Sequence, residues 1–349
     1  MNQKIYVYGT GRYATNFLKN VKLDFIYGFI ETRKEKYLFY KKPVFSVPEV
    51  EEYDLIIVAS QFVHEIRATL YRNGIDLSKV VFLADSWIPA KIVNGTLAFD
   101  FMKSVSIPED ECVFFDIGAI YTTSQVLANY MLGTITSNAF WENISYYQTS
   151  VHVPHVSNCQ RSMLEQSFVK NLSKTDTICD IGCASGEWSR LISPFVSKID
   201  AYDLSDNLIK TGIDISESYG FHNISFYSVD ALDIEFKKKY DHALMLGIGI
   251  YLEKHKLDNL IKNISAAINN DGYLAVRDTV TMYTDKTVYM IRKEGGNIFE
   301  NYTATYIPLR EYEKLYTDNG FEIIEESYFS SYFHRPMELG AHGYIFRKK

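Results

Sequence analysis

Short apolar runs alternate with amphipathic segments along much of the chain. In the first 84 residues the strand-like runs are KIYVYG, FIYGFIE, DLIIVAS and KVVFLA, and the helix-like segments include one around 62–73. Apolar strands that alternate with amphipathic helices are typical of a parallel sheet covered on both faces. We therefore expect a small α/β domain over residues 1–88.

The same rhythm returns at about residue 166 and continues to the end of the chain. The expected strands there are DTICDIG, KIDAYDL, NISFYSV, DHALMLG, DGYLAV, FEIIEESYF and HGYIFRKK, and the expected helices are 187–196, 205–218, 254–268 and LREYEKLYTDNG. The pattern predicts an α/β protein with two Rossmann-like domains, the larger one a seven-stranded sheet over 166–349. Residues 89–165 lack the rhythm and are expected to form a connector and lid.

Composition narrows the partners and the compartment. The 349 residues are 47% hydrophobic, and 43 acidic side chains outnumber 36 basic ones, for a net charge of −7. This charge argues against nucleic acid, and the longest apolar stretch, 243–252, is too short to cross a membrane. The first residues lack a leader pattern, and the four cysteines lack metal spacing. We expect a cytoplasmic protein with no nucleic-acid, membrane or metal partner; a homo-oligomer stays open.

A glycine-containing turn follows the first strand of the second half. In CDIGCASGEW, Asp180 ends the strand, and Gly182 and Gly186 lie in the turn that opens a helix. Glycine permits a sharp bend and close approach of a ligand, and a helix start offers free N–H groups. The alternative is a tight strand-to-helix turn without a ligand.

Two further carboxylates end the next two strands. Asp203 ends KIDAYD and Asp230 ends NISFYSVD, and ligands of open parallel sheets bind outside the carboxyl ends of the strands. Asp203 is placed to accept hydrogen bonds from vicinal ribose hydroxyls, and Asp230 with Ala231 is placed to hold an adenine edge. Because this half lacks a GxGxxG pyrophosphate cradle, we expect an adenosine cofactor without phosphates.

The motif DIGCASG, Asp203 at the second strand end and VDA at 229–231 resemble the class I S-adenosylmethionine-dependent methyltransferases over residues 166–349. The resemblance implies S-adenosylmethionine as cofactor and a sheet whose last strand is antiparallel. Ala184 stands where a glycine is frequent in that family, and Tyr251 where many members have histidine. The cofactor-binding residues that the resemblance implies are Asp180, Gly182, Cys183, Gly186, Asp203, Leu204, Asp230, Ala231 and Gly247.

Methyl transfer from a sulfonium is an in-line displacement, so alignment and exclusion of water are the main requirements. An oxygen nucleophile also requires a base. The candidates are His152 and His155 in the expected lid, and Tyr251 and Asp278 after the fourth and fifth strands. The alternatives are loop-packing histidines and, for Tyr251, a core aromatic.

Substrate contacts are expected after the fifth strand. Arg277 is a candidate for an anionic substrate group, or else pairs with Asp278. The long aromatic and polar segment 279–305, which includes Tyr283, is expected to form a wall of the acceptor site. The alternative is a surface excursion that stabilises an oligomer.

The N-terminal domain has its own glycine signal. Gly9 and Gly11 follow a strand, and Glu31 ends the next strand, which satisfies the spacing of a dinucleotide fingerprint. The segment, with GFIET and GIDLSKVVFL, resembles small Rossmann-like domains attached to bacterial sugar-modifying acyltransferases and to methyltransferases of surface-polysaccharide clusters. The resemblance implies a nucleotide or nucleotide-sugar site, or a docking module. A ligand-free packing turn and an NAD site stay open.

Together these features predict a methyltransferase (EC 2.1.1) that modifies a hydroxyl or amine of a small molecule. The resemblance favours as acceptor a sugar, nucleotide sugar or related metabolite of bacterial surface-polysaccharide or secondary biosynthesis. The alternatives are a non-catalytic S-adenosylmethionine-binding module that docks other enzymes, and an NAD-binding enzyme that uses the N-terminal glycine motif.

Overall fold

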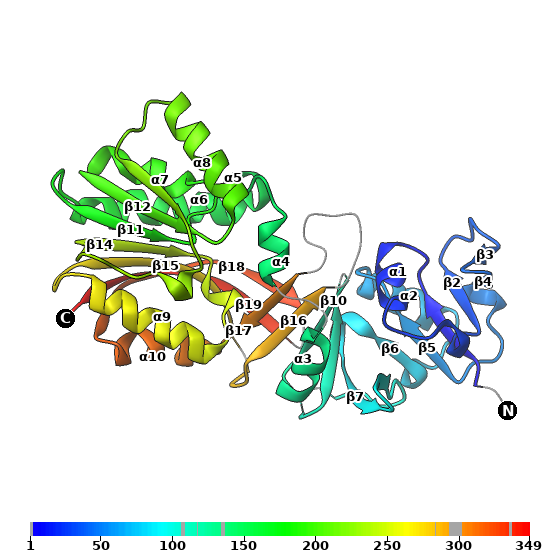
Figure 1. Ribbon diagram of the computed structural model, residues 1–349. Helices are drawn as coiled ribbons and strands as arrows, with labels where there is room; N and C mark the ends of the chain where they lie inside the picture. The colour runs from blue at the N-terminus through cyan, green and yellow to red at the C-terminus, as the bar shows by residue number, and fades with distance from the viewer. Residues whose placement is uncertain are drawn as a thin grey trace. The chain divides into compact units, whose positions relative to one another are not determined.

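The computed structural model (Figure 1) describes residues 3–105, 109–116, 118–133, 137–282, 284–292, 302–334 and 337–349. The chain forms two compact units. The first comprises Met1–Ile135, Val288–Tyr302 and His334–Pro336, and the second Thr136–Thr287, Thr303–Phe333 and Met337–Lys349. This division differs from the expected boundaries. Residues 89–135 belong to the same unit as 1–88, and the rest of the expected connector belongs to the second unit.

The first unit begins with a mostly parallel sheet in the order β3-β4-β2-β1-β5-β6, in which only the β3–β4 pair is antiparallel. The apolar runs that predicted these strands are buried, as Val7, Ile56 and Ile57 show with 0% exposure. Its elements are β1 Ile5–Tyr8, α1 Arg12–Leu18, β2 Gly28–Glu31, β3 Leu38–Phe39, β4 Lys42–Ser46, β5 Leu55–Val58, α2 Val63–Arg72 and β6 Val80–Phe82.

The first unit also contains an antiparallel sheet that the sequence pattern did not predict. The strands of this sheet that belong to the first unit run in the order β16-β10-β9-β7-β8. The segment FMKS at 101–104 follows β8 and begins with a turn in which the Lys103 N–H donates to Asp100 O at 3.1 Å. The elements are β7 Trp87–Val93, β8 Thr96–Phe99, β9 Cys112–Asp116, β10 Ala119–Thr122, α3 Gln125–Leu132 and β16 Val288–Arg292.

The second unit is built on a sheet in the order β13-β12-β11-β14-β15-β19-β18. The strands from β13 to β15 are parallel, and β19 is antiparallel to β15. All seven overlap the segments from which the sequence predicted strands, and β15, β18 and β19 extend beyond those segments. The elements are α4 Ser137–Glu142, α5 Thr149–His152, α6 Pro154–Met163, β11 Thr177–Ile181, α7 Glu187–Ile192, β12 Lys198–Asp203, α8 Asp206–Ser218, β13 Ile224–Ser228, β14 His242–Leu246, α9 Lys254–Ala267, β15 Tyr273–Thr281, β17 Thr303–Tyr306, α10 Leu309–Asp318, β18 Phe321–His334 and β19 Met337–Lys348.

Helices cover both faces of this sheet (Figure 1). On one face, α9 and α10 pack against β11, β14 and β15 through residues such as Leu257 and Tyr312. On the other face, α6, α7 and α8 pack through residues such as Met163, Trp188 and Ile209. Two packed layers on a buried parallel sheet fix the strand ends rigidly, so a site built there is held in place.

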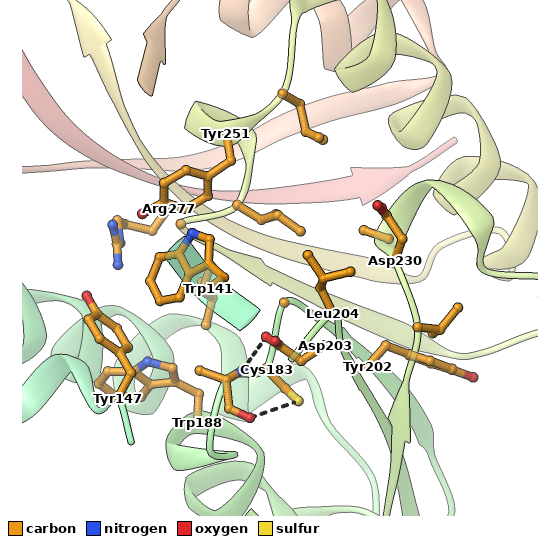
Figure 2. A pocket seen from close by; sticks show the side chains of 18 of the residues that line it. Trp141, Tyr147, Cys183, Trp188, Tyr202, Asp203, Leu204, Asp230, Tyr251 and Arg277 are labelled. Atoms are coloured by element: carbon orange, nitrogen blue, oxygen red, sulfur yellow. Dashed lines mark hydrogen bonds between the residues drawn. The ribbon is translucent and has the colours of Figure 1, made fainter. Parts of the chain in front are cut away.

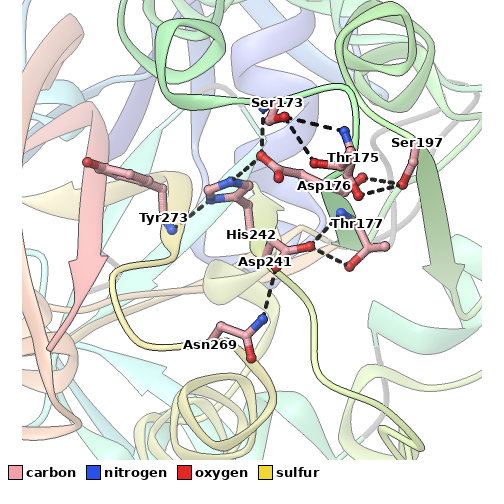
Figure 3. A network of polar contacts seen from close by, with 9 residues as sticks. All are labelled: Ser173, Thr175, Asp176, Thr177, Ser197, Asp241, His242, Asn269 and Tyr273. Carbon is pink, nitrogen blue, oxygen red and sulfur yellow. Dashed lines mark hydrogen bonds and ion pairs between the residues drawn. The ribbon is translucent and has the colours of Figure 1, made fainter.

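A polar network joins the amino ends of β11, β14 and β15 (Figure 3). The ring of His242, 6% exposed, lies between Asp176 Oδ2, 3.0 Å from its Nε2, and the backbone N–H of Tyr273, which donates to Nδ1 at 3.0 Å. Nδ1 accepts, so Nε2 carries the proton of a neutral ring. Burial lowers the pKa of His242, and Asp176 partly opposes this effect.

Acidification is expected to weaken the second unit through His242. Because the pKa is lower in the folded state, the unfolded chain takes up the proton first. Stability is therefore present above about pH 6.5, the pKa of an unfolded histidine, and falls as the pH drops below it. Denaturant unfolding between pH 8 and pH 5.5 should show a smaller loss in His242→Gln than in the wild type. His255→Gln, at an exposed histidine, should retain the wild-type slope; equal slopes in all three proteins would contradict the assignment.

Among the helices of the described part of the chain, none combines the length and apolar character that a membrane span requires. In the same residues, no three or more His, Cys, Asp or Glu side chains are grouped to hold a metal ion.

Candidate active site

The turn after β11 requires its glycines. Gly182 and Gly186 have φ values of +74° and +75°, and a Cβ on Gly186 would lie 2.7 Å from the ring of Phe226. Ala184 is also left-handed, with φ +48°, and its N–H donates to Asp203 Oδ2 at 2.8 Å. The carboxylate therefore holds the turn in a conformation that an alanine rarely adopts.

Asp203 ends β12 directly beside this turn. Besides the bond from Ala184, it accepts a hydrogen bond from the N–H of Ser205 at 2.9 Å. Burial raises the pKa of Asp203, and the two backbone donors oppose this effect. Each carboxylate oxygen can accept more than one hydrogen bond, so capacity remains for a ligand.

Asp180 is buried in the core, whereas Asp230 lines the cavity described below. Asp180 is 2% exposed and accepts a hydrogen bond from the hydroxyl of Ser189 on α7; burial raises its pKa to about 7. It supports the turn from within the core. Asp230 follows β13, and its Oδ1 accepts the N–H of Leu232 at 3.0 Å.

These strand ends surround a cavity of about 300 Å³ in the second unit (Figure 2). The predicted cofactor residues that line it are Gly182, Cys183, Asp203, Leu204, Asp230, Ala231 and Gly247. Asp180 and Gly186 are not among the lining residues. Most of the predicted cofactor residues, which end or follow four separate strands, therefore line one cavity.

The cavity also has aromatic walls that the sequence did not identify. Trp141 lies between Tyr147 and Tyr251, with ring centroids 5.2 Å from each, and Trp188 lines the same cavity. Trp141 and Tyr147 come from the segment expected to be a lid, where AFWENISYY is unusually aromatic. In a chain that is 15% aromatic, that signal does not separate cavity-lining from core residues.

Arg277 lines the cavity, in accordance with its predicted position. Its Nε donates to Gln160 Oε1 on α6 at 2.9 Å, and its guanidinium packs against Gly247, where a Cβ would lie 2.9 Å from Nη2. Gly247 has φ +91°, so both its conformation and the guanidinium exclude a side chain there.

Asp278 does not line the cavity. Successive side chains of a strand point to opposite faces, so Asp278 lies under α10, 1% exposed, and accepts the hydroxyl of Tyr312 at 2.6 Å. Burial raises the pKa of Asp278 to about 6, although the Tyr312 hydroxyl, the charge of Arg277 and the backbone of Ile250 and Gly249 all act to lower it. This position does not fit the expected role of a base at the ligand edge. The charge of Arg277 favours the ionised form of Asp278, but the two side chains do not form a close ion pair within the described residues.

Of the remaining catalytic candidates, one lines the cavity and two do not. Tyr251 lines the cavity. His155 is exposed, and its Nε2 lies 3.2 Å from the carbonyl oxygen of Phe329, so it is not a lining residue. His152 is not one either, but it stacks on Tyr147 with ring centroids 4.8 Å apart.

The segment 279–305 differs from the expected acceptor wall. Its first residues extend β15, and Val288–Arg292 forms β16, which pairs with β10 in the first unit. The apolar side chains of Val288, Met290 and Ile291 are buried there. None of the described residues of 279–305 lines the cavity, and Tyr283 lies outside the described residues.

The residues of the N-terminal glycine turn contact neighbouring residues of the first unit. Gly9 has φ +115°. A Cβ at this position would lie 2.9 Å from the carbonyl oxygen of Ala59, the residue that follows the neighbouring strand β5. Glu31 accepts hydrogen bonds from the Thr10 hydroxyl and, at 3.3 Å, from the N–H of Glu35. These contacts account for Gly9 and Glu31 through packing, and Gly11 is the N-cap of the seven-residue helix α1. A nucleotide, nucleotide-sugar or NAD site here stays a prediction.

Comparison with known proteins gives one family match. Curated protein sequences gave no match. Similar solved structures include the N-methyltransferase NodS of Bradyrhizobium japonicum with S-adenosylhomocysteine (14% identity, 61% of this chain and 96% of that chain, TM-score 0.45), the magnesium protoporphyrin IX methyltransferase of Synechocystis with S-adenosylmethionine (16%, 64% and 96%, 0.44) and an S-adenosylmethionine-dependent methyltransferase of Leishmania major (14%, 60% and 81%, 0.47). Residues 158–326, which supply most of the cavity, match the family model of a methyltransferase domain.

Proposed function

We propose that the chain is an S-adenosylmethionine-dependent methyltransferase that acts on a hydroxyl or amine of a small molecule. The observation that carries the proposal is the convergence of Gly182, Asp203 and Asp230, at three strand ends, on one cavity. The methyltransferase family match over 158–326 supports it.

The cofactor supplies an electrophilic methyl group on a sulfonium, and the donor set of the cavity suits its nucleoside. Asp203 retains acceptor capacity for two ribose hydroxyls. Asp230 and the backbone of Ala231 are the residues proposed to hold the adenine edge, and the turn at Gly182 is proposed to border the methionine part, because all three residues line the cavity.

The other lining residues would align the acceptor and exclude water. Trp141, Tyr147 and Tyr251 supply aromatic rings to the wall of the cavity. Alignment in a dry site is the main contribution that a methyl transfer needs. For an oxygen acceptor, Tyr251 is the proposed base, because it lines the cavity and His155 does not; an amine acceptor requires none.

Three finer expectations remain proposals. The acceptor as a sugar, nucleotide sugar or related metabolite rests on the resemblance of the N-terminal domain. A docking role of that domain, and binding of NAD at Gly9 and Glu31, are the alternatives.

Thermal unfolding with S-adenosylhomocysteine tests the proposal. At about 100 times Kd, the ligand is expected to stabilise the folded state by about 2.7 kcal/mol, which raises Tm by roughly 5–10 °C. NAD at the same concentration serves as comparison. The absence of any rise with S-adenosylhomocysteine contradicts the proposal, and a larger rise with NAD favours the N-terminal dinucleotide site.

A further inference from the structure

We infer that the acceptor carries an anionic oxygen group, a carboxylate or a phosphoryl, which binds Arg277, next to a flat unsaturated ring that packs against Trp141. This inference rests on the proposed function, since it concerns the part of the cavity beyond the cofactor-binding strand ends. In the view of Figure 2, Arg277, Tyr251, Trp141 and Tyr147 gather on one side, and Asp203 and Asp230 lie on the other.

Arg277 is held in place through its Nε, and its terminal N–H groups are not used by a carboxylate of the described residues. Its Nε is bound by Gln160, which is 0% exposed, and Gly247 supports the flat side of the guanidinium. Within the described residues, Arg277 forms no ion pair with a carboxylate. A guanidinium fixed through Nε presents its terminal N–H groups as a fork, the geometry that binds carboxylate and phosphoryl oxygens.

Lys256, the second cationic side chain that lines the cavity, already has an ion-pair partner. Lys256 on α9 pairs with Glu253 at 3.2 Å, so its charge is already compensated. An acceptor that binds between the aromatic walls displaces water from Arg277. The buried Asp278 carboxylate acts on Arg277 through its charge alone. A neutral acceptor would therefore leave the terminal N–H groups of a desolvated guanidinium without an acceptor oxygen, which is costly, whereas an anionic one supplies it.

The aromatic walls favour a flat molecule. Trp141 stands edge-to-face to Tyr147 and Tyr251, with interplanar angles of 86° and 75°. Its indole Nε1 is buried and has no hydrogen-bond partner within the described chain. This donor would be satisfied by an oxygen of the acceptor.

Matched pairs of acids and neutral analogues test the inference. Isothermal titration in saturating S-adenosylhomocysteine compares 4-hydroxybenzoate with 4-hydroxybenzamide, anthranilate with anthranilamide, and UDP with uridine. At least one acid should bind about tenfold more tightly than its neutral partner, as expected for a charged hydrogen-bonded pair. The benzoates report a carboxylate, and UDP reports a phosphoryl group.

Variants show whether Arg277 is the cause. Arg277→Met should remove the preference for the acid, and Arg277→Lys should keep part of it. Lys256→Met also removes one positive charge from the lining of the cavity, and this variant should keep the preference for the acid. The inference is overturned if no acid is preferred by the wild type, or if Arg277→Met retains the preference. Binding of S-adenosylhomocysteine is measured first in each protein: its absence in the wild type defeats the proposed function as well, whereas its presence without an anion preference defeats only the inference.

Discussion

Replacing Asp203 by alanine is expected to abolish the stabilisation that S-adenosylhomocysteine gives to the wild type. The variant loses an ionised acceptor for two ribose hydroxyls, at about 1.5–3 kcal/mol for each charged hydrogen bond, so affinity falls by a hundredfold or more. It also frees the N–H groups of Ala184 and Ser205, which lowers stability without ligand. The informative quantity is therefore the ligand-induced shift in Tm, and not Tm itself.

Two companions separate ligand binding from folding. Asp203→Asn keeps the size of the side chain and should retain a weakened shift. Asp206→Ala removes a carboxylate three residues away whose side chain is 70% exposed and pairs with Lys210; it should keep the full shift. If Asp203→Ala folds and retains the wild-type shift, Asp203 does not bind the ribose.

Replacing Asp278 by alanine is expected to lower the free energy of unfolding by about 3 kcal/mol, and Tm by roughly 10 °C. The buried carboxylate accepts the Tyr312 hydroxyl and interacts favourably with the adjacent backbone of Gly249 and Ile250, directly before Tyr251 in the chain. The substitution leaves these partners unsatisfied. Denaturant unfolding at pH 8 measures the effect, because the carboxyl is then ionised: its raised pKa is about 6.

The control for Asp278 is Tyr312→Phe, which removes one donor and leaves the carboxylate its backbone partners. It should cost about 1 kcal/mol. A loss below that value in Asp278→Ala would show that the carboxylate does not anchor this segment. A base at the cavity would instead lower turnover with little loss of stability, so the two roles give opposite results.

The strand-end residues illustrate what local pattern predicts well. Asp203 and Asp230 could be placed in one cavity because the carboxyl ends of adjacent parallel strands meet at one edge. Arg277 and Asp278 show the limit of this reasoning. Both occur at the end of the fifth expected strand, which continues as β15 to Thr281, and alternation then separates them onto opposite faces of the sheet.

Other parts of the site depend on contacts between distant segments. Trp141 and Tyr147 lie in a stretch without periodicity, so only the folded chain shows that Trp141 contacts both Tyr147 and Tyr251, the latter more than 100 residues later. The pairing of β16 with β10, with Met290 opposite Tyr121, is a second example. Residues 288–292 of the predicted acceptor wall are a strand of a sheet in the first unit. Such pairings are set by burial and register, and not by local propensity.

The sequence by itself therefore determined the two α/β rhythms, the glycine turn at Gly182 and Gly186, and the acids at the strand ends. These follow from short-range periodicity and from the backbone freedom of glycine, which each segment carries on its own. Only the tertiary structure decided which side chains face the cavity, where the second sheet of the first unit forms, and that Arg277 is held by Gln160 and Gly247. Those features depend on the packing of segments far apart in the chain, which no local pattern encodes.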